Sequence, residues 1–289
     1  MFKTIINAWK IADLRKKMLF TALIVFIFRL GAALPVPFVN ISGGLISDQN
    51  ANNFMTYLSM MTGDAFNYGT LFAMSITPYI NASIIIELLT VAIPALERLA
   101  KEGEEGRKKI STITRYSSVV LALMQSTAYY FYIRSQNYLS LDADGNKFTG
   151  FFAVLQAITI IFCYTAGASL IMWLGEQINE KGIGNGISII LFAGIVSRMP
   201  TTLYSLYSYM DKGGAYYALA PIAFVSLILM IGFIVWMDNA ERRIPVQYAK
   251  RVVGRKMYGG QSTHIPIKVN MCGVLPIIFA SSILSLPPT

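Results

Sequence analysis

The chain has 289 residues, of which 55% are hydrophobic and only 13% are charged, and its formal net charge is +9. Soluble domains carry roughly 25% charged residues, so this composition excludes an ordinary soluble domain, while one histidine and two cysteines predict neither a metal cluster nor a disulfide framework. In a chain this apolar, clustered Lys and Arg favour the cytoplasmic loops of a membrane protein over a nucleic-acid-binding surface.

Seven segments are apolar enough for membrane-spanning helices, each of which needs about 20 residues to cross the hydrocarbon core. In chain order these are 18–38, 71–93, 116–136, 151–174, 184–204, 217–237 and 271–288. The fifth is rich in glycine at its start, and the seventh is broken by Pro276. The pattern predicts an all-α polytopic bundle of transmembrane helices.

Basic residues lie mainly on one side of these spans. The segments before the first span, between the second and third, between the fourth and fifth, and between the sixth and seventh hold 19 of the 24 Lys and Arg residues. Because cytoplasmic loops carry the excess of Lys and Arg, we expect the N-terminus in the cytoplasm.

The segment 39–70 follows the first span on the opposite side and is neither charged nor strongly apolar. Its second half, 54–68, is rich in Met, aromatic and small residues. Two interpretations remain open. The segment is either an interfacial helix at the outer headgroups, or a re-entrant piece whose backbone is shielded by protein or by a water-filled cavity.

Two motifs could indicate catalysis or ligand binding, but each has a simpler explanation. The GIGNGIS stretch (182–188) lacks the preceding strand and the Gly-Lys-Ser/Thr of a phosphate-binding loop, so a tight cytoplasmic turn is favoured. Ser169 in the fourth span could act as an intramembrane nucleophile, but the only histidine, His264, lies in a basic loop. A packing face of small residues is favoured there, and we expect neither a catalytic site nor a cofactor.

Polar residues within or near the spans are further candidates for function. Arg29 is expected to be paired or to face protein, because an isolated charge at membrane depth is costly. Glu87 is either a snorkelling side chain or a functional residue, and Gln125 lies in the third span. The long basic stretch 238–270 is either a solvated loop or a docking surface for an acidic or RNA-bearing partner.

Several long stretches carry a family resemblance. They are TPYINASIIIELLT (77–90), KEGEEGRKKISTITRY (101–116), WLGEQINEKGIGNGISIILFAGIV (173–196), ERRIPVQYAKR (241–251) and GGQSTHIPIKVNMCGVLPIIFASSI (259–283). In this order they resemble the second span, the loop after it, the fourth-to-fifth connection, the sixth-to-seventh loop and the seventh span of the SecY family. That family forms the channel through which polypeptides cross or enter the membrane.

The resemblance implies a clamshell of ten spans in two pseudo-symmetric halves around an hourglass pore, of which seven spans are present here. The first half would be 1–204, with spans one to five, and a partial second half would be 205–289. A ring of aliphatic side chains would line the waist of the pore, at Ile76, Ile80, Ile187, Leu191 and Ile278. A plug at about 58–68 would block the pore at rest, with Leu58, Met60, Met61, Gly63 and Phe66 as its candidate residues.

The resemblance also implies a lateral gate and a docking loop. The candidate gate residues are Asn81, Gln125 and Asn270. The residues offered to the ribosome or the SecA motor would be Arg242, Arg243, Lys250, Arg251, Arg255 and Lys256. The other partners implied are the small membrane subunits SecE and SecG, signal-sequence-bearing polypeptides and membrane lipids.

The function implied is the central pore subunit of the export channel in the plasma membrane, which passes unfolded polypeptides and releases transmembrane segments laterally into lipid. Because the family's last three spans have no counterpart here, a truncated chain is expected. A secondary transporter of small solutes is the alternative, since it would explain Arg29, Glu87 and the broken helices. A waist of Ile and Leu argues against that alternative.

Overall fold

A computed structural model describes residues 9–41, 43–45, 59, 62–140, 150–211, 216–246, 251–253, 256–258 and 263–270. The chain is mostly helical and divides into two compact units, 1–200 and 201–289. The seventh expected span, with Ile278, lies outside the described residues. The predicted helical polytopic architecture is confirmed, and each unit is described by itself below.

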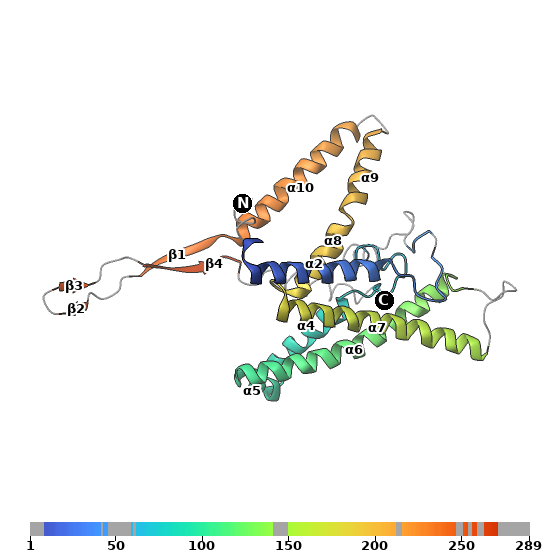
Figure 1. Ribbon diagram of the computed structural model, residues 1–289, viewed down its shortest axis with the longest axis horizontal. Helices are drawn as coiled ribbons and strands as arrows, with labels where there is room; N and C mark the ends of the chain where they lie inside the picture. The colour runs from blue at the N-terminus through green and yellow to red at the C-terminus, as the bar shows by residue number, and fades with distance from the viewer. Residues whose placement is uncertain are drawn as a thin grey trace. The chain divides into compact units, whose positions relative to one another are not determined.

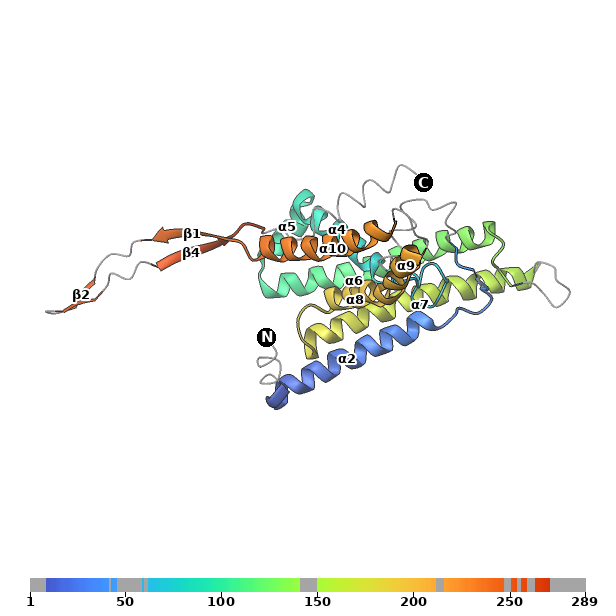
Figure 2. The same ribbon diagram turned by 90° about the horizontal axis from the view of Figure 1, so that it is seen from above.

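The first unit is a bundle of helices in which the helix Phe151–Lys181 packs against several others (Figures 1 and 2). Its helices are α2 (Ala12–Ala33), α4 (Thr77–Ala92), α5 (Pro94–Lys101), α6 (Glu104–Ser135), α7 (Phe151–Lys181) and α8 (Gly186–Ser197). α7 packs against α6, α8 and α2, and α4 packs against α6. α2, α4, α6, α7 and α8 lie in the first five expected spans, α5 follows the second, and α9 (Met199–Asp211) begins directly after Arg198.

Local sequence explains where these helices begin and end. α4 begins at Thr77-Pro78, where the missing N–H of proline costs no helical hydrogen bond. Pro94 then bends the chain by 101° between α4 and α5. α6 begins well before its apolar part, because Glu104 and Glu105 in its first turn suit the positive end of the helix dipole. Asn185 caps the start of α8, and its side chain accepts hydrogen bonds from the N–H groups of residues 187 and 188.

Three helices among the described residues are long and apolar enough to cross a membrane, namely Phe151–Lys181, Gly186–Ser208 and Pro221–Asp238. The bent pair α4–α5 makes a fourth if it is counted as one span. α2 and α6 are also long helices, but they are less apolar. The apolar sequence of α2 is interrupted by Lys16, Lys17 and Arg29. α6 carries Gln125 among several tyrosines.

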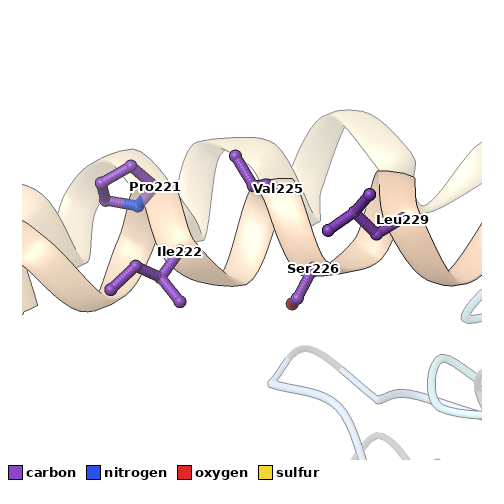
Figure 3. A pocket seen from close by; sticks show the side chains of 5 residues that line it. All are labelled: Pro221, Ile222, Val225, Ser226 and Leu229. Carbon is purple, nitrogen blue, oxygen red and sulfur yellow. The ribbon is translucent and has the colours of Figure 1, made fainter.

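The second unit contains α10 (Tyr216–Asp238) followed by a β-ribbon. Every described side chain of α10 is exposed. Figure 3 shows its side chains at Pro221, Ile222, Val225, Ser226 and Leu229, which line an open, shallow hollow on the helix. A helix that is apolar all round is suited to contact with lipid or with other helices.

The basic stretch after α10 forms strands rather than an irregular loop. β1 (Glu241–Val246) pairs antiparallel with β4 (Thr263–Lys268), from Glu241↔Lys268 to Val246↔Thr263. β2 (Arg251–Val253) pairs with β3 (Lys256–Tyr258) beyond them, so the ribbon projects from the end of α10 (Figure 2). The sequence predicted a basic loop between two spans and no strands, so the ribbon adds regular structure to that loop. Ile244 and Val246 on β1 lie two residues apart, as do Ile265 and Ile267 on β4, and this period of two suits a pleated strand.

Candidate functional site

A buried, non-helical segment between α2 and α4 is the most unusual feature of the first unit. Residues 62–76 form successive turns, and most of their side chains are buried. The buried ones are Thr62, Ala65, Phe66, Thr70, Phe72, Ala73, Met74, Ser75 and Ile76. The burial of this part of the chain agrees with a re-entrant piece shielded by protein, and 62–76 is called the re-entrant segment below.

The backbone carbonyls of this segment are not paired within a helix, and tyrosine hydroxyls donate hydrogen bonds to two of them. The Tyr129 hydroxyl on α6 donates to the carbonyl of Phe66, and the Tyr164 hydroxyl on α7 donates to that of Gly69 at 3.0 Å. The N–H of Leu71 donates to the carbonyl of Leu34 at 2.9 Å. An unpaired backbone group in an apolar interior costs several kcal/mol, so these bonds permit irregular chain at membrane depth.

Glycines on the neighbouring helices make room for the segment. A Cβ at Gly167 of α7 would overlap with the carbonyl oxygen of Leu71, and one at Gly31 of α2 would overlap with the ring of Phe72. Phe72 also stacks on Phe28, with ring centroids 5.9 Å apart. The segment is thus held between α2, α6 and α7 by both packing and hydrogen bonds.

The structure brings the described aliphatic ring candidates into one hydrophobic cluster. Ile76 is 1% exposed and belongs to it, while Ile80, Ile187 and Leu191 are partly buried and pack against it. The N–H of Ile80 donates to the carbonyl of Ile76, which places the two residues one turn apart at the start of α4. The cluster also contains residues of α2, α7 and the re-entrant segment, so it forms part of the hydrophobic interior of this unit. A pore-lining role for these residues stays a prediction.

Two plug candidates are described, and both are tightly enclosed. Phe66 packs against Tyr129, with ring centroids 4.7 Å apart. Gly63 has a φ of +64°, a conformation that favours glycine, and a Cβ there would lie 2.7 Å from the carbonyl oxygen of Gly194. The candidates Leu58, Met60 and Met61 lie outside the described residues.

Sequence reasoning missed an ion pair beside the plug candidates. The Arg198 Nε lies 2.9 Å from Oδ2 of Asp64. A signal was available, because Arg198 is the one charged residue in the fifth expected span and a charge at that depth needs a partner. Sequence alone could not identify Asp64 as that partner, since the two residues are far apart along the chain.

The candidate gate residues are only partly brought together. Asn81 and Gln125 are half-buried on α4 and α6, two helices that pack against each other. Asn270 is exposed and belongs to the unit 201–289. Their role in a gate stays a prediction.

The candidate docking residues fall mostly on the ribbon. Arg242 and Arg243 are exposed on β1, and Arg251 and Lys256 lie on β2 and β3. Lys250 and Arg255 are outside the described residues. Since neighbouring residues of a strand point to opposite faces, Arg242 and Arg243 do not share a face.

Three other polar candidates have simple surroundings. Arg29 is exposed and forms no ion pair with the described residues, so of the two expectations, pairing or facing protein, pairing is not seen there. It instead borders an open hollow of about 470 Å³ between α2 and α8, lined mainly by apolar side chains. Glu87 is exposed, and the Ser169 hydroxyl donates to the carbonyl of Thr165 at 2.9 Å.

Within the described part of the chain, no three His, Cys, Asp or Glu residues lie together as a metal site requires.

Comparison with known proteins gives consistent matches over almost the whole chain. The sequence profile of the SecY family matches residues 70–289. A protein translocase subunit SecY of Streptomyces scabiei is 42% identical over 290 residues, covering 99% of this chain and 66% of that relative. The corresponding protein of Corynebacterium glutamicum is 44% identical, covering 98% of this chain and 64% of that relative. The chain thus spans slightly less than two thirds of the length of these relatives.

Solved structures share the fold at lower identity. A protein-conducting channel superposes with a TM-score of 0.61 at 19% identity, covering 94% of this chain and 56% of that channel. Sec61 in a canine ribosome–channel complex from the endoplasmic reticulum gives a TM-score of 0.60 at 18% identity, covering 94% of this chain and 57% of that protein. At these identities the likeness concerns the fold alone.

Proposed function

The chain belongs to the SecY family, and from that premise we propose that it contributes the central pore of a protein-conducting channel. The channel passes unfolded polypeptides across the plasma membrane and releases transmembrane segments laterally into lipid. The observation that carries the proposal is the buried re-entrant segment 62–76, which packs beside the aliphatic cluster of Ile76, Ile80, Ile187 and Leu191. A blocked apolar constriction is the arrangement that a resting channel needs.

The chemistry of this cluster suits a polypeptide rather than an ion. An apolar constriction gates by dewetting, so it conducts water and ions poorly. Aliphatic side chains can also yield around a passing chain of any sequence, because they form no strong directional bonds with it. In this proposal Ile76, Ile80, Ile187, Leu191 and Ile278 form the ring, and 58–68 is the plug that fills it at rest.

The halves of the channel follow from the same proposal. Residues 1–204 would form the first half of the clamshell and 205–289 part of the second, an assignment supported by the compact unit 1–200. Asn81, Gln125 and Asn270 would line the lateral gate between the halves. The N-terminus would be cytoplasmic, as the distribution of Lys and Arg indicates.

The partners would be those of a bacterial export channel. SecE and SecG would be the small membrane subunits, and the SecA motor or the ribosome would dock on the basic ribbon after α10. Its exposed Arg242 and Arg243 support this assignment, since an accessible cationic surface attracts acidic or RNA-bearing partners.

Reconstitution tests the proposed function. The complete gene product, purified with its small subunits into proteoliposomes, is expected to make a signal-sequence-bearing polypeptide resistant to added protease in the presence of SecA and ATP. Replacing Ile80 with Glu is expected to raise the resting ion conductance, whereas Ile85→Glu on the exposed side of α4 should not. Absence of protected polypeptide together with unchanged conductance of Ile80→Glu would refute the proposal.

A further inference from the structure

Arg198 occupies an unusual position for a charged residue. It lies about halfway along the apolar span Gly186–Ser208, between the end of α8 and the start of α9. An ionised side chain at such a depth is costly unless a charge, a polar group or water compensates for it. Its side chain is 29% exposed, so protein surrounds most of it.

The compensating charge comes from the re-entrant segment. Oδ2 of Asp64 lies 2.9 Å from Nε of Arg198, a distance typical of a charge-assisted hydrogen bond. The other carboxylate oxygen, Oδ1, accepts a hydrogen bond from the Ser59 hydroxyl at 3.1 Å. Ser59 is buried, and the Asp64 side chain is 24% exposed, so the carboxylate is oriented from two sides in a mostly enclosed site.

The backbone around Asp64 fixes its position against α8. Gly63 and Asp64 both have positive φ values, +64° and +71°, which place the carboxylate at a sharp turn. The N–H of Asp64 donates to the carbonyl of Ser59 at 3.0 Å and closes that turn. Beside it, the absence of a side chain at Gly63 lets the turn approach the carbonyl of Gly194.

We propose that Asp64 and Arg198 form a latch that holds the re-entrant segment in its sealing position. This inference rests on the proposed channel function and adds a residue pair that positions the plug. Because each partner compensates for the charge of the other in a mostly enclosed site, departure of the segment is favoured when water can solvate the separated charges. Opening of the latch is thus coupled to hydration of the pore.

Charge reversal and exchange test the latch. Asp64→Arg and Arg198→Asp each leave like charges facing one another, and each is expected to raise the resting ion conductance of the reconstituted gene product about fivefold or more. The double variant Asp64→Arg/Arg198→Asp restores opposite charges, and its conductance is expected to be lower than that of either single variant. Asp64→Asn keeps the size of the side chain but not its charge, so its conductance should be intermediate.

Glu97 and Lys101 on α5 provide the matched control. They form an exposed ion pair at 2.6 Å, with side chains 50% and 74% exposed, so reversal of either charge should leave the conductance unchanged. Conductance is normalised to membrane-inserted protein, which separates a leak from a failure to fold. The latch is contradicted if single variants at 64 and 198 conduct no more than the α5 controls, or if the exchange restores nothing. Protein translocation by the unmodified chain is measured in parallel, since its absence would reject the channel function and not the latch alone.

Discussion

Gly167 and Gly175 lie about two turns apart on α7, but only the second has room for a side chain. A Cβ at Gly167 would overlap with the backbone of the re-entrant segment, at the carbonyl oxygen of Leu71. A Cβ at Gly175 would lie 3.6 Å from Ile190, an ordinary van der Waals contact. The close approach at Gly167 therefore decides how deeply the segment sits in the bundle.

This difference predicts opposite outcomes for two alanine substitutions. Gly167→Ala is expected to destabilise the protein by about 1–3 kcal/mol, because the segment or the helix must shift. Gly175→Ala is expected to be neutral or stabilising by up to about 1 kcal/mol, because alanine favours the helix and its methyl group fits. Thermal unfolding in detergent, followed by circular dichroism, measures both, and equal unfolding temperatures would contradict the packing described at Gly167.

At the residue scale, the ring candidates have in the sequence an apolar character that fits a buried cluster, whereas the polar contacts have no such signal. Ile76, Ile80, Ile187 and Leu191 were identified by motif position, and their apolar character made a shared cluster a reasonable expectation. The hydrogen bond from Tyr164 to Gly69 and the pair Asp64–Arg198 depend on how distant segments fold together. No local pattern in the sequence records such contacts.

At the scale of elements, long apolar runs predicted the helices of the first unit, but not their full lengths. α6 and α7 continue beyond the apolar residues, because their polar extensions also favour helix. The β-ribbon was not predicted, since its charged residues suggested a solvated loop. Pro245 and Pro266 lie within its strands and each lacks an N–H donor, which limits pairing of the ribbon's edges with other chains.

We predict that the two faces of the ribbon contribute differently to ribosome binding. Arg242 shares a face with Ile244, Ile265 and Ile267, whereas Arg243 shares the other with Glu241, Lys268 and His264. If phosphates of ribosomal RNA bind the face that carries Arg243 and Lys268, Arg243→Gln should weaken ribosome binding and reduce the magnitude of its salt-dependence slope by about 0.7–0.9.

The neighbouring variant Arg242→Gln is the control for this prediction. It removes the same charge from the apolar face and should change the salt dependence much less. Ribosome binding to the detergent-solubilised protein, measured across a series of salt concentrations, distinguishes the two variants. Equal slopes for both would show that the faces do not act differently.

At the scale of the whole molecule, the distribution of Lys and Arg predicts the orientation in the membrane. If α6 spans the membrane, its two ends lie on opposite sides of the membrane. A cysteine at Lys109 is therefore expected to be cytoplasmic, and one at Gln136 to be external. In intact cells a membrane-impermeant maleimide should label the cysteine at 136 but not that at 109, in a background without Cys163 and Cys272. The reverse pattern would invert the orientation.

Site-specific photo-crosslinking tests whether polypeptides pass beside the aliphatic cluster, as proposed above. A photoreactive amino acid is placed at Ile80 or Leu191, which pack against the cluster, and separately at Ile85 or Phe192, which are exposed on the same two helices. A polypeptide stalled during translocation through the complete channel is predicted to crosslink from positions 80 and 191 and not from 85 and 192. Crosslinks from the exposed positions alone, or equally from all four, would contradict a translocation path along this cluster.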